Sequence, residues 1–336
     1  DGHDGGGPCV VEDERGNVLG AGYYNPEAKI AVRLLQHRRS SELPFELQPL
    51  ADLLASRITA AVERRVNLGL PSADTTVYRV VNSEGDGLSG LIVDRLGDTL
   101  SVQLNSRAMY ESRDLIADTL ERVCGISTMV LAVSATASRL EAMPSGTEHR
   151  GSEEPFEIVE HGLRYRVKLG AGQKTGFYAD QRESRARFAA LCEGRTVLDL
   201  MCYVGAFGLN AARAGATRVE GVDSSGPAIR AALTHADLNG VADRVTLYEA
   251  DTMTFLKEAQ AKGRTWDRIV LDPPKLARGR AHLDEAIKKY ARLNTLALAS
   301  LAPGGLLLTC SCSQHVSRDA FLRVLDSANS MFDEIK

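Results

Sequence analysis

The second half of this sequence predicts an α/β fold with a doubly wound, mainly parallel sheet. Short apolar runs alternate there with segments of helical periodicity, as in sheets whose strands are joined by helices. The runs, with the residues directly after them, are 197–208, 218–223, 245–251, 267–275 and 305–313. Acidic residues lie at the ends of the first four runs, and Cys and Ser residues end the fifth. Because open parallel sheets bind ligands beyond the carboxyl ends of their strands, a binding site is predicted at this edge.

The first run leads into a loop that suits a nucleotide-type ligand. Asp199 ends the apolar stretch, small residues follow, and residues 209–214 are helix-like. Gly205 and Gly208 allow the backbone to approach a ligand closely, and the N-terminus of a helix offers unpaired N–H groups. The loop lacks both the G-x-G-x-x-G spacing and the Lys-Ser/Thr pair of a P-loop, so neither a dinucleotide nor ATP phosphates are well served.

The acids after the next three runs strengthen this prediction. Asp223 follows the loop by about 20 residues, where a ribose hydroxyl is held in dinucleotide folds. Asp251 ends the third run, and Asp272 opens the sequence Asp-Pro-Pro-Lys after the fourth. One acid at a strand end is ordinary turn chemistry, whereas four in succession favour a site.

The N-terminal residues predict β-structure followed by a long helix. Residues 10–26 contain two strand-like runs around a Gly16-Asn17 turn, and residues 30–35 read as another strand. Residues 45–68 carry apolar side chains at helical spacing. We interpret the basic residues of this helix as a solvated face rather than an RNA contact; they are Arg57, Arg64 and Arg65.

A small α+β module is predicted in the middle of the chain. Its expected elements are β-structure over 76–104, a helix over 109–124, a strand over 129–133, a polar loop over 146–155 and a hairpin over 156–169. Residues 82–87 contain the Gly and Asp residues of a turn, so we assign them no catalytic role.

Composition limits the class of protein. With 44% hydrophobic and 25% charged residues, the sequence is typical of a soluble globular protein, and it has no apolar run long enough to span a membrane. A net charge of −4 does not indicate nucleic-acid binding, although a local basic face would suffice for it. The six cysteines lack zinc or disulfide-framework spacing, so we expect no metal and a reducing cytosolic compartment. The chain begins at Asp1 rather than Met, so we expect it to be a fragment; an upstream targeting segment would permit organellar import.

Several motifs together resemble a known family. The acids at the strand ends look like the S-adenosylmethionine-dependent methyltransferase fold, which is Rossmann-like. More narrowly, residues 172–185, Asp-Pro-Pro-Lys at 272–275 and Thr-Cys-Ser-Cys-Ser at 309–313 resemble the PUA-domain-containing 23S rRNA 5-methylcytosine methyltransferases. The resemblance runs from about Val10 to the last residues.

The resemblance implies S-adenosylmethionine as cofactor and assigns residues to it. Carboxylates suit this molecule because its sulfonium is cationic and it has no pyrophosphate to repel them. Asp199 is expected at the amino group, Asp223 at the ribose hydroxyls and Asp251 at the adenine amino group. The full implied set is Phe177, Tyr178, Asp180, Gln181, Arg182, Asp199, Cys202, Tyr203, Val204, Gly205, Asp223, Ser224, Asp251, Thr252, Asp272 and Pro273.

The catalytic residues implied by the resemblance are Cys312, Asp272 and Lys275. Carbon 5 of cytosine is a weak nucleophile until a thiolate adds at carbon 6, and the family motif gives this role to the second cysteine, Cys312. Asp272 would meet a base edge, and Lys275 a phosphate or base. Lys275 stands where amino-group methyltransferases carry Tyr or Phe for stacking, which argues against that chemistry. For Cys312 and Lys275 the alternatives are a buried structural cysteine and a solvated lysine.

The expected function is therefore an RNA methyltransferase that forms 5-methylcytosine in ribosomal RNA. One alternative is a non-covalent guanine-N methyltransferase on the same scaffold, and another is an RNA-binding protein with a vestigial cofactor fold. A single-stranded or flexible RNA segment is the expected substrate, because the target base must leave its stack. The oligomeric state stays open, with a homodimer among the alternatives.

The resemblance also implies the domain organisation. We expect a partial PUA-like RNA-binding module over 1–40, a linker helix over 41–72, the α+β module over 73–170 and the methyltransferase domain over 171–336. The first strands of the PUA-like barrel and the last strands of the methyltransferase sheet are expected to lie outside this chain.

Overall fold

A computed structural model of the chain describes residues 6–37, 48–169, 177–277, 279–313 and 315–335. The chain forms two compact units. The first contains residues 1–162 and 167–180, and the second contains residues 163–166 and 181–336. No helix among the described residues is long and apolar enough to cross a membrane.

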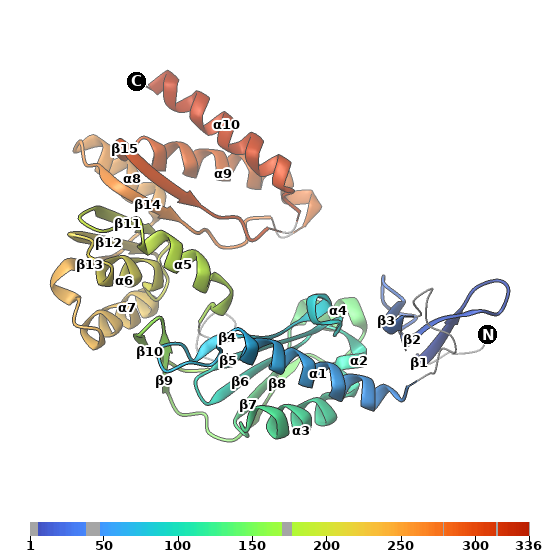
Figure 1. Ribbon diagram of the computed structural model, residues 1–336. Helices are drawn as coiled ribbons and strands as arrows, with labels where there is room; N and C mark the ends of the chain where they lie inside the picture. Colours follow the sequence, from blue (N-terminus) through green and yellow to red (C-terminus); the bar gives the residue numbers. More distant parts are fainter. Residues whose placement is uncertain (1–5, 38–47, 170–176, 278, 314, 336) are drawn as a thin grey trace. The chain divides into compact units, whose positions relative to one another are not determined.

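A parallel sheet forms the centre of the second unit (Figure 1). Its strands within the described residues are β11 (Thr196–Leu200), β12 (Arg218–Asp223), β13 (Val245–Glu249), β14 (Trp266–Leu271) and β15 (Leu301–Thr309). They lie in the order β13-β12-β11-β14-β15, and all four neighbouring pairs are parallel. This confirms the predicted sheet. The direction of winding reverses at β11, so the ends of β11 and its neighbours border the crevice where such folds bind ligands.

Helices connect these strands and cover the sheet (Figure 1). They are α5 (Arg182–Ala189), α6 (Ala206–Arg213), α7 (Gly226–Leu238), α8 (Thr252–Ala261), α9 (Leu283–Leu298) and α10 (Arg318–Ile335), with short 3₁₀ turns at Ala179–Gln181, Ala242–Arg244 and Arg280–His282. Apolar side chains from both sides of the strands pack with them; Leu198, Ile269 and Leu293 have no exposed surface. A parallel sheet buried in this way requires the nearly continuous apolar runs seen in the sequence.

Among the described residues of the first unit, two sheets precede the hairpin at residues 156–167. The N-terminal one is antiparallel and consists of β1 (Gly7–Glu12), β2 (Val18–Tyr24) and β3 (Val32–His37). After α1 (Leu50–Asn67), the second sheet has the order β4-β5-β6-β7-β8. Its strands are Val77–Asn82, Leu91–Leu96, Thr99–Leu104, Met129–Val133 and Gly146–Arg150, and its helices are α2 (Arg107–Glu111), α3 (Arg113–Cys124) and α4 (Ala135–Glu141), with a 3₁₀ turn at Ser83–Asp86.

A hairpin follows this sheet where the sequence predicts one. Its strands are β9 (Phe156–Glu160) and β10 (Leu163–Val167). His161 and Gly162 both have positive φ, 48° and 74°, as a two-residue hairpin turn requires.

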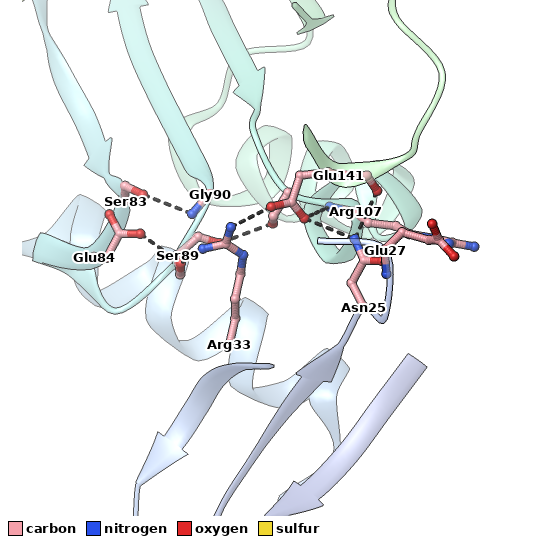
Figure 2. Close-up of polar contacts among 10 residues, drawn as sticks. Asn25, Glu27, Arg33, Ser83, Glu84, Ser89, Gly90, Arg107 and Glu141 are labelled. Atoms are coloured by element: carbon pink, nitrogen blue, oxygen red, sulfur yellow. Dashed lines mark hydrogen bonds and ion pairs between the residues drawn. The ribbon is translucent and has the colours of Figure 1, made fainter. Parts of the chain in front are cut away.

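Glu141, at the end of α4, is the buried centre of a polar network in the first unit (Figure 2). Its carboxylate accepts hydrogen bonds from Arg33 Nη2 at 2.5 Å, Asn25 Nδ2 at 3.2 Å and the backbone N–H of Arg107 at 3.3 Å. Arg33 also donates to Ser89, whose hydroxyl donates to Glu84. The N-terminal sheet is thus fixed by charged hydrogen bonds to the module that follows it. Tyr23 adds a further one by donating to Glu111.

Two sequence-based predictions in this unit are wrong. We expected a loop over 146–155, but Gly146–Arg150 is β8, an edge strand paired antiparallel with β7. Backbone hydrogen bonds hold an edge strand even when its side chains are polar, so hydrophobic periodicity misses it. The helix expected over 109–124 is instead two helices, α2 and α3, that meet at Ser112.

The basic residues of α1 are a third correction. Arg65 donates two hydrogen bonds to Asp86, at 2.6 and 2.7 Å, and Arg57 donates to the carbonyl of Gly87 at 3.0 Å. Only Arg64 of the three is half exposed, with 53% of its side chain accessible. The face we expected to be solvated therefore holds the Ser83–Asp86 turn in place.

Candidate functional site

The loop between β11 and α6 has an unusual backbone. Met201, Tyr203 and Gly205 have φ values of 59°, 51° and 79°, so two residues with side chains adopt the left-handed conformation that favours glycine. Cys202 donates its N–H to Val222 O at 3.0 Å, which ties the loop to β12. Such conformations cost about 1–2 kcal/mol each and concentrate at ligand sites.

Asp223 holds this loop from the end of β12. One of its oxygens accepts the N–H of Tyr203 at 2.8 Å, and the other accepts the N–H of Ser225 at 2.8 Å. A carboxylate has about four lone-pair sites, so both oxygens can still accept hydroxyl groups from a ligand. Ser224, next to Asp223, is exposed.

Asp199 lies beneath the start of α6. Its carboxylate is buried and accepts the N–H of Gly208 at 2.8 Å. Burial raises the pKa of this carboxyl to about 7. The Gly208 N–H and Arg185 act to lower this pKa, and the charges of Asp272 and Asp223 act to raise it. A Cβ at Gly208 would meet Val219 Cγ1 at 2.9 Å, so only glycine allows this close approach.

Cys202 and Val204 lie within the same loop and are buried. Burial, and then the charges of Asp199 and Asp223, raise the pKa of the Cys202 thiol well above its ordinary value. The carbonyl of Val204 lies 3.2 Å from Nδ1 of His235, a buried α7 residue whose Nε2 lies 3.1 Å from Arg166 O. Cys202 is therefore a poor nucleophile, and His235 supports the loop from behind.

Asp251 is exposed and caps α8. Its Oδ1 accepts hydrogen bonds from Thr254 N at 2.9 Å and Thr254 Oγ1 at 3.1 Å. The Thr254 N–H bond holds the pKa of the Asp251 carboxyl below its ordinary value. Thr252 is buried in the first turn of the helix. The adenine contact expected for Asp251 stays a prediction.

The segment before β11 contributes two side chains within the second unit. Gln181 Nε2 donates to Asp272 Oδ2 at 3.3 Å. Arg182 pairs with Glu183 through Nε and Nη2, whereas its Nη1 is buried and has no hydrogen-bond partner. A buried guanidinium N–H without a partner is costly, and a ligand carboxylate would satisfy it.

Phe177, Tyr178 and Asp180 belong to the first compact unit, where they are buried, half-buried and exposed, respectively. Residues 172–176 of the motif in which they occur lie outside the described residues. The cofactor contacts expected for these three side chains stay predictions.

The ends of β14 and β15 bring Asp272 and the two cysteines together. The pairing of β14 with β15 extends to Leu271 and Thr309. One further hydrogen bond follows, from Cys310 N to Leu271 O at 2.9 Å. Burial, and then the nearby Asp272 charge, raise the pKa of the Cys310 thiol to about 12. Cys310 therefore stays protonated at neutral pH.

Cys312 differs from Cys310 in being exposed. Its Sγ lies 3.7 Å from the carbonyl oxygen of Pro273, so the thiol faces the Asp-Pro-Pro-Lys loop. Pro273 is buried, and Lys275 is exposed at the end of that loop. An accessible thiol, a carboxylate and an amine thus lie on two adjacent loops at the carboxyl edge of the sheet.

Two side chains near these loops were missed by the sequence analysis. Arg185 on α5 is 2% exposed, and its guanidinium lies 5.9 Å from the centre of the Phe207 ring. Tyr290 on α9 is fully buried, with its hydroxyl 3.1 Å from both Ser311 Oγ and Ser313 Oγ. In the sequence, Arg185 looks like a residue of a solvated helix and Tyr290 like a core aromatic. Nothing in the sequence therefore marks either residue as part of a site. No cluster of three or more potential metal ligands occurs in the described part of the chain.

The architecture and site can now be compared with known proteins. A model of the S-adenosylmethionine-dependent methyltransferases matches residues 88–331, and a PUA-like domain model matches residues 2–37. The chain belongs to the S-adenosylmethionine-dependent methyltransferase family. Its cofactor is S-adenosylmethionine, as the sequence predicted. The PUA-like match confirms the kind of N-terminal module expected.

Curated relatives cover most of the chain. The ribosomal RNA large subunit methyltransferase I of Shewanella denitrificans is 36% identical over 93% of this chain and 78% of its own length. The ribosomal RNA large subunit methyltransferase of Deinococcus radiodurans is 35% identical over 95% of this chain and 79% of its own. Among solved structures, the methyltransferase SMU.776 complexed with SAH has a TM-score of 0.81 at 24% identity, covering 96% of this chain and 81% of that one. This structural likeness supports the fold.

Proposed function

We propose that this methyltransferase forms 5-methylcytosine in large-subunit ribosomal RNA through a covalent bond between Cys312 and carbon 6 of the base. The RNA substrate follows from the names of the curated relatives, which are ribosomal RNA large subunit methyltransferases. The observation that carries the covalent route is the exposed Cys312 thiol beside the Asp272 loop. The Cys310 and Cys202 thiols, by contrast, are held protonated by burial.

The cofactor-side residues fit this proposal. We assign the ribose hydroxyls to Asp223, the amino group to Asp199, and the methionine carboxylate to the unpartnered Nη1 of Arg182. Asp251 is assigned to the adenine amino group. Bound S-adenosylmethionine supplies an electrophilic methyl group, and the acids around it favour its positive charge.

The proposed reaction balances as an addition, a transfer and an elimination. The Cys312 thiolate adds to carbon 6, and the electron pair of the 5,6 double bond makes carbon 5 nucleophilic. Carbon 5 takes the methyl group, and S-adenosylhomocysteine leaves with the electron pair of the broken carbon–sulfur bond. A base removes the carbon-5 proton, the double bond re-forms and the thiolate is expelled. In this scheme Asp272, held by Gln181, meets the edge of the flipped base, and Lys275 contacts phosphate or base.

Trapping with RNA that contains 5-fluorocytosine tests the proposal, because fluorine blocks the proton loss that precedes release. Wild-type protein is expected to form a covalent complex with this RNA and S-adenosylmethionine. Cys312→Ser is expected to bind both but to form no adduct and transfer no methyl group, since a serine hydroxyl is far less nucleophilic than a thiolate. Denaturing gels and methyl-transfer assays measure the two activities.

The matched control is Cys310→Ser, which is expected to keep much of its trapping and transfer activity. An adduct with Cys312→Ser but not with Cys310→Ser would exchange the two roles. Methyl transfer without an adduct in wild type would instead support the non-covalent guanine alternative.

A further inference from the structure

The residues on either side of Cys312 share one buried partner. Ser311 Oγ donates to the hydroxyl of Tyr290 at 3.1 Å, and that hydroxyl lies 3.1 Å from Ser313 Oγ. Tyr290 and Ser313 are 0% and 4% exposed. Three hydroxyls each have one proton, so a chain in which Ser311 donates to Tyr290 and Tyr290 donates to Ser313 satisfies both contacts.

Ser313 also connects this chain of hydroxyls to the neighbouring loop. Its Oγ accepts the N–H of Ala277 at 3.1 Å, just beyond Asp-Pro-Pro-Lys. The pairing of β14 with β15 has ended by this point: its last residue pair is Leu271 with Thr309, and its last hydrogen bond is that of the Cys310 N–H. Beyond that point, the Tyr290–Ser313–Ala277 contacts link the cysteine loop to the Asp272 loop.

The side chains alternate along the cysteine loop. Ser311, which is exposed, and Ser313, which is buried, both contact the Tyr290 hydroxyl, whereas the side chain between them, Cys312, contacts Pro273 O instead. Fixing both flanking serines restricts the backbone that carries the thiol. A displacement of about 1 Å can cost a reaction about a hundredfold, so such restraint has a direct effect on rate.

The hydroxyl of Tyr290 is not required for packing. Its ring makes an edge-to-face contact with Phe321 at 5.6 Å between centroids, which phenylalanine would also make. A buried hydroxyl costs free energy unless it is hydrogen-bonded. The contribution of the Tyr290 hydroxyl is therefore its hydrogen bonding to the two serines.

We propose that Tyr290 is a positioning residue for methyl transfer, which holds Cys312 at the Asp-Pro-Pro-Lys loop through Ser311 and Ser313. The proposal rests on the proposed role of Cys312 as nucleophile. Tyr290 touches neither substrate nor cofactor in this role and acts through the two serines.

Tyr290→Phe tests the proposal, because it removes only the hydroxyl. At saturating RNA and S-adenosylmethionine, the rate of trapping on 5-fluorocytosine RNA and kcat should fall about 10- to 100-fold. KM for RNA and the cofactor affinity should stay within about twofold of wild type. A purely structural role would leave kcat unchanged in the folded fraction. Ser313→Ala should also lower kcat, and the losses in the double variant should be less than additive, because both single variants lose the contact between Tyr290 and Ser313.

The control is Tyr78→Phe, which removes a buried hydroxyl that interacts with Arg95 in the first unit and should leave kcat and trapping at wild-type values. Trapping by Tyr290→Phe at the wild-type rate would overturn the inference, as would additive losses in the double variant. If Tyr290→Phe does not fold, Ser313→Ala alone decides between the same outcomes. Absence of trapping in wild type would instead overturn the proposed function, so the two failures are distinguishable.

Discussion

Burial raises the pKa of the Asp199 carboxyl to about 7 from an ordinary value of 3.8, so this residue would make the proposed cofactor site sensitive to pH. Between these two values the folded protein holds a proton that the unfolded chain has released. Stability of the ligand-free protein therefore decreases as pH rises through this window. A cationic ligand acts in the opposite direction, because it favours the ionised carboxylate.

We predict that S-adenosylmethionine affinity of the wild type rises with pH between about pH 6 and pH 8, by up to about tenfold per unit below pH 7. Asp199→Asn should lose this dependence, because the amide does not titrate. Calorimetric titration at several pH values measures the effect. Asp267→Asn is the control: the Asp267 pKa is lowered by Thr196 at the other end of the strands, so this variant should keep the wild-type profile. A flat wild-type profile would contradict the assignment.

At the scale of elements, the network around Glu141 fixes the N-terminal sheet to the rest of the first unit (Figure 2). The Glu141 side chain is 6% exposed and that of Arg33 is 18% exposed, so neither partner is well hydrated. Removing one partner of a buried pair leaves the other charge uncompensated, which costs more than the pair itself contributes.

Glu141→Ala is accordingly expected to lower the free energy of unfolding of the first unit by about 3–5 kcal/mol. Glu148→Ala is the matched control, because the Glu148 side chain is 46% exposed and pairs with Arg113 and Arg150; its cost should be about 0–1 kcal/mol. Denaturant unfolding measures both changes. Equal losses in the two variants would show that burial of Glu141 is not what stabilises this contact.

The elements that the sequence predicted are those with a strong apolar pattern. β11, β12 and β14 are mostly buried and appear as apolar runs such as Val270-Leu271, and the hairpin has its His161-Gly162 turn. β8 was missed because backbone pairing at a sheet edge leaves no side-chain pattern. Arg57, Arg65 and Tyr290 were misread or missed because their roles depend on partners far away in the sequence. The acids proposed for the site could be predicted from the sequence because the carboxyl ends of parallel strands converge at one edge of the sheet.

At the scale of the whole molecule, RNA binding must be reconciled with a net charge of −4. After the Asp-Pro-Pro-Lys loop the sequence carries the basic residues Arg278, Arg280, Lys288 and Lys289, which suit a basic rim for RNA. Arg278 lies outside the described residues, and the side chain of Arg280 is not described. Lys288 and Lys289 are exposed on α9, and Lys289 acts on the Asp251 carboxylate. Positive charge is therefore available next to the proposed site.

We predict that RNA affinity falls steeply with salt and that Lys288→Glu/Lys289→Glu weakens it. Each lost phosphate contact should reduce the slope of log affinity against log salt by about 1. Filter binding or fluorescence anisotropy over a salt series gives the slope. Lys257→Glu/Lys262→Glu changes the net charge equally and should leave the slope unchanged. Both lysines are exposed, but Lys257 lies beyond the first turn of α8 and Lys262 directly follows the helix, whereas Asp251 lies at its N-terminus. An unchanged slope in the α9 variant would remove these lysines from the RNA interface.

The strand order of the sheet also sets a sequence of events during translation. β14 pairs with β11 in the middle of the sheet but leaves the ribosome after β12 and β13. The bonds of the loop between β11 and α6, from Cys202 to Val222 and from Tyr203 to Asp223, involve only β11, β12 and the residues between them. Cys312 is synthesised later, after β15. Since domains generally fold as units, these loop bonds are expected to become stable only when β14 has emerged to pair with β11, shortly before the nucleophile is made.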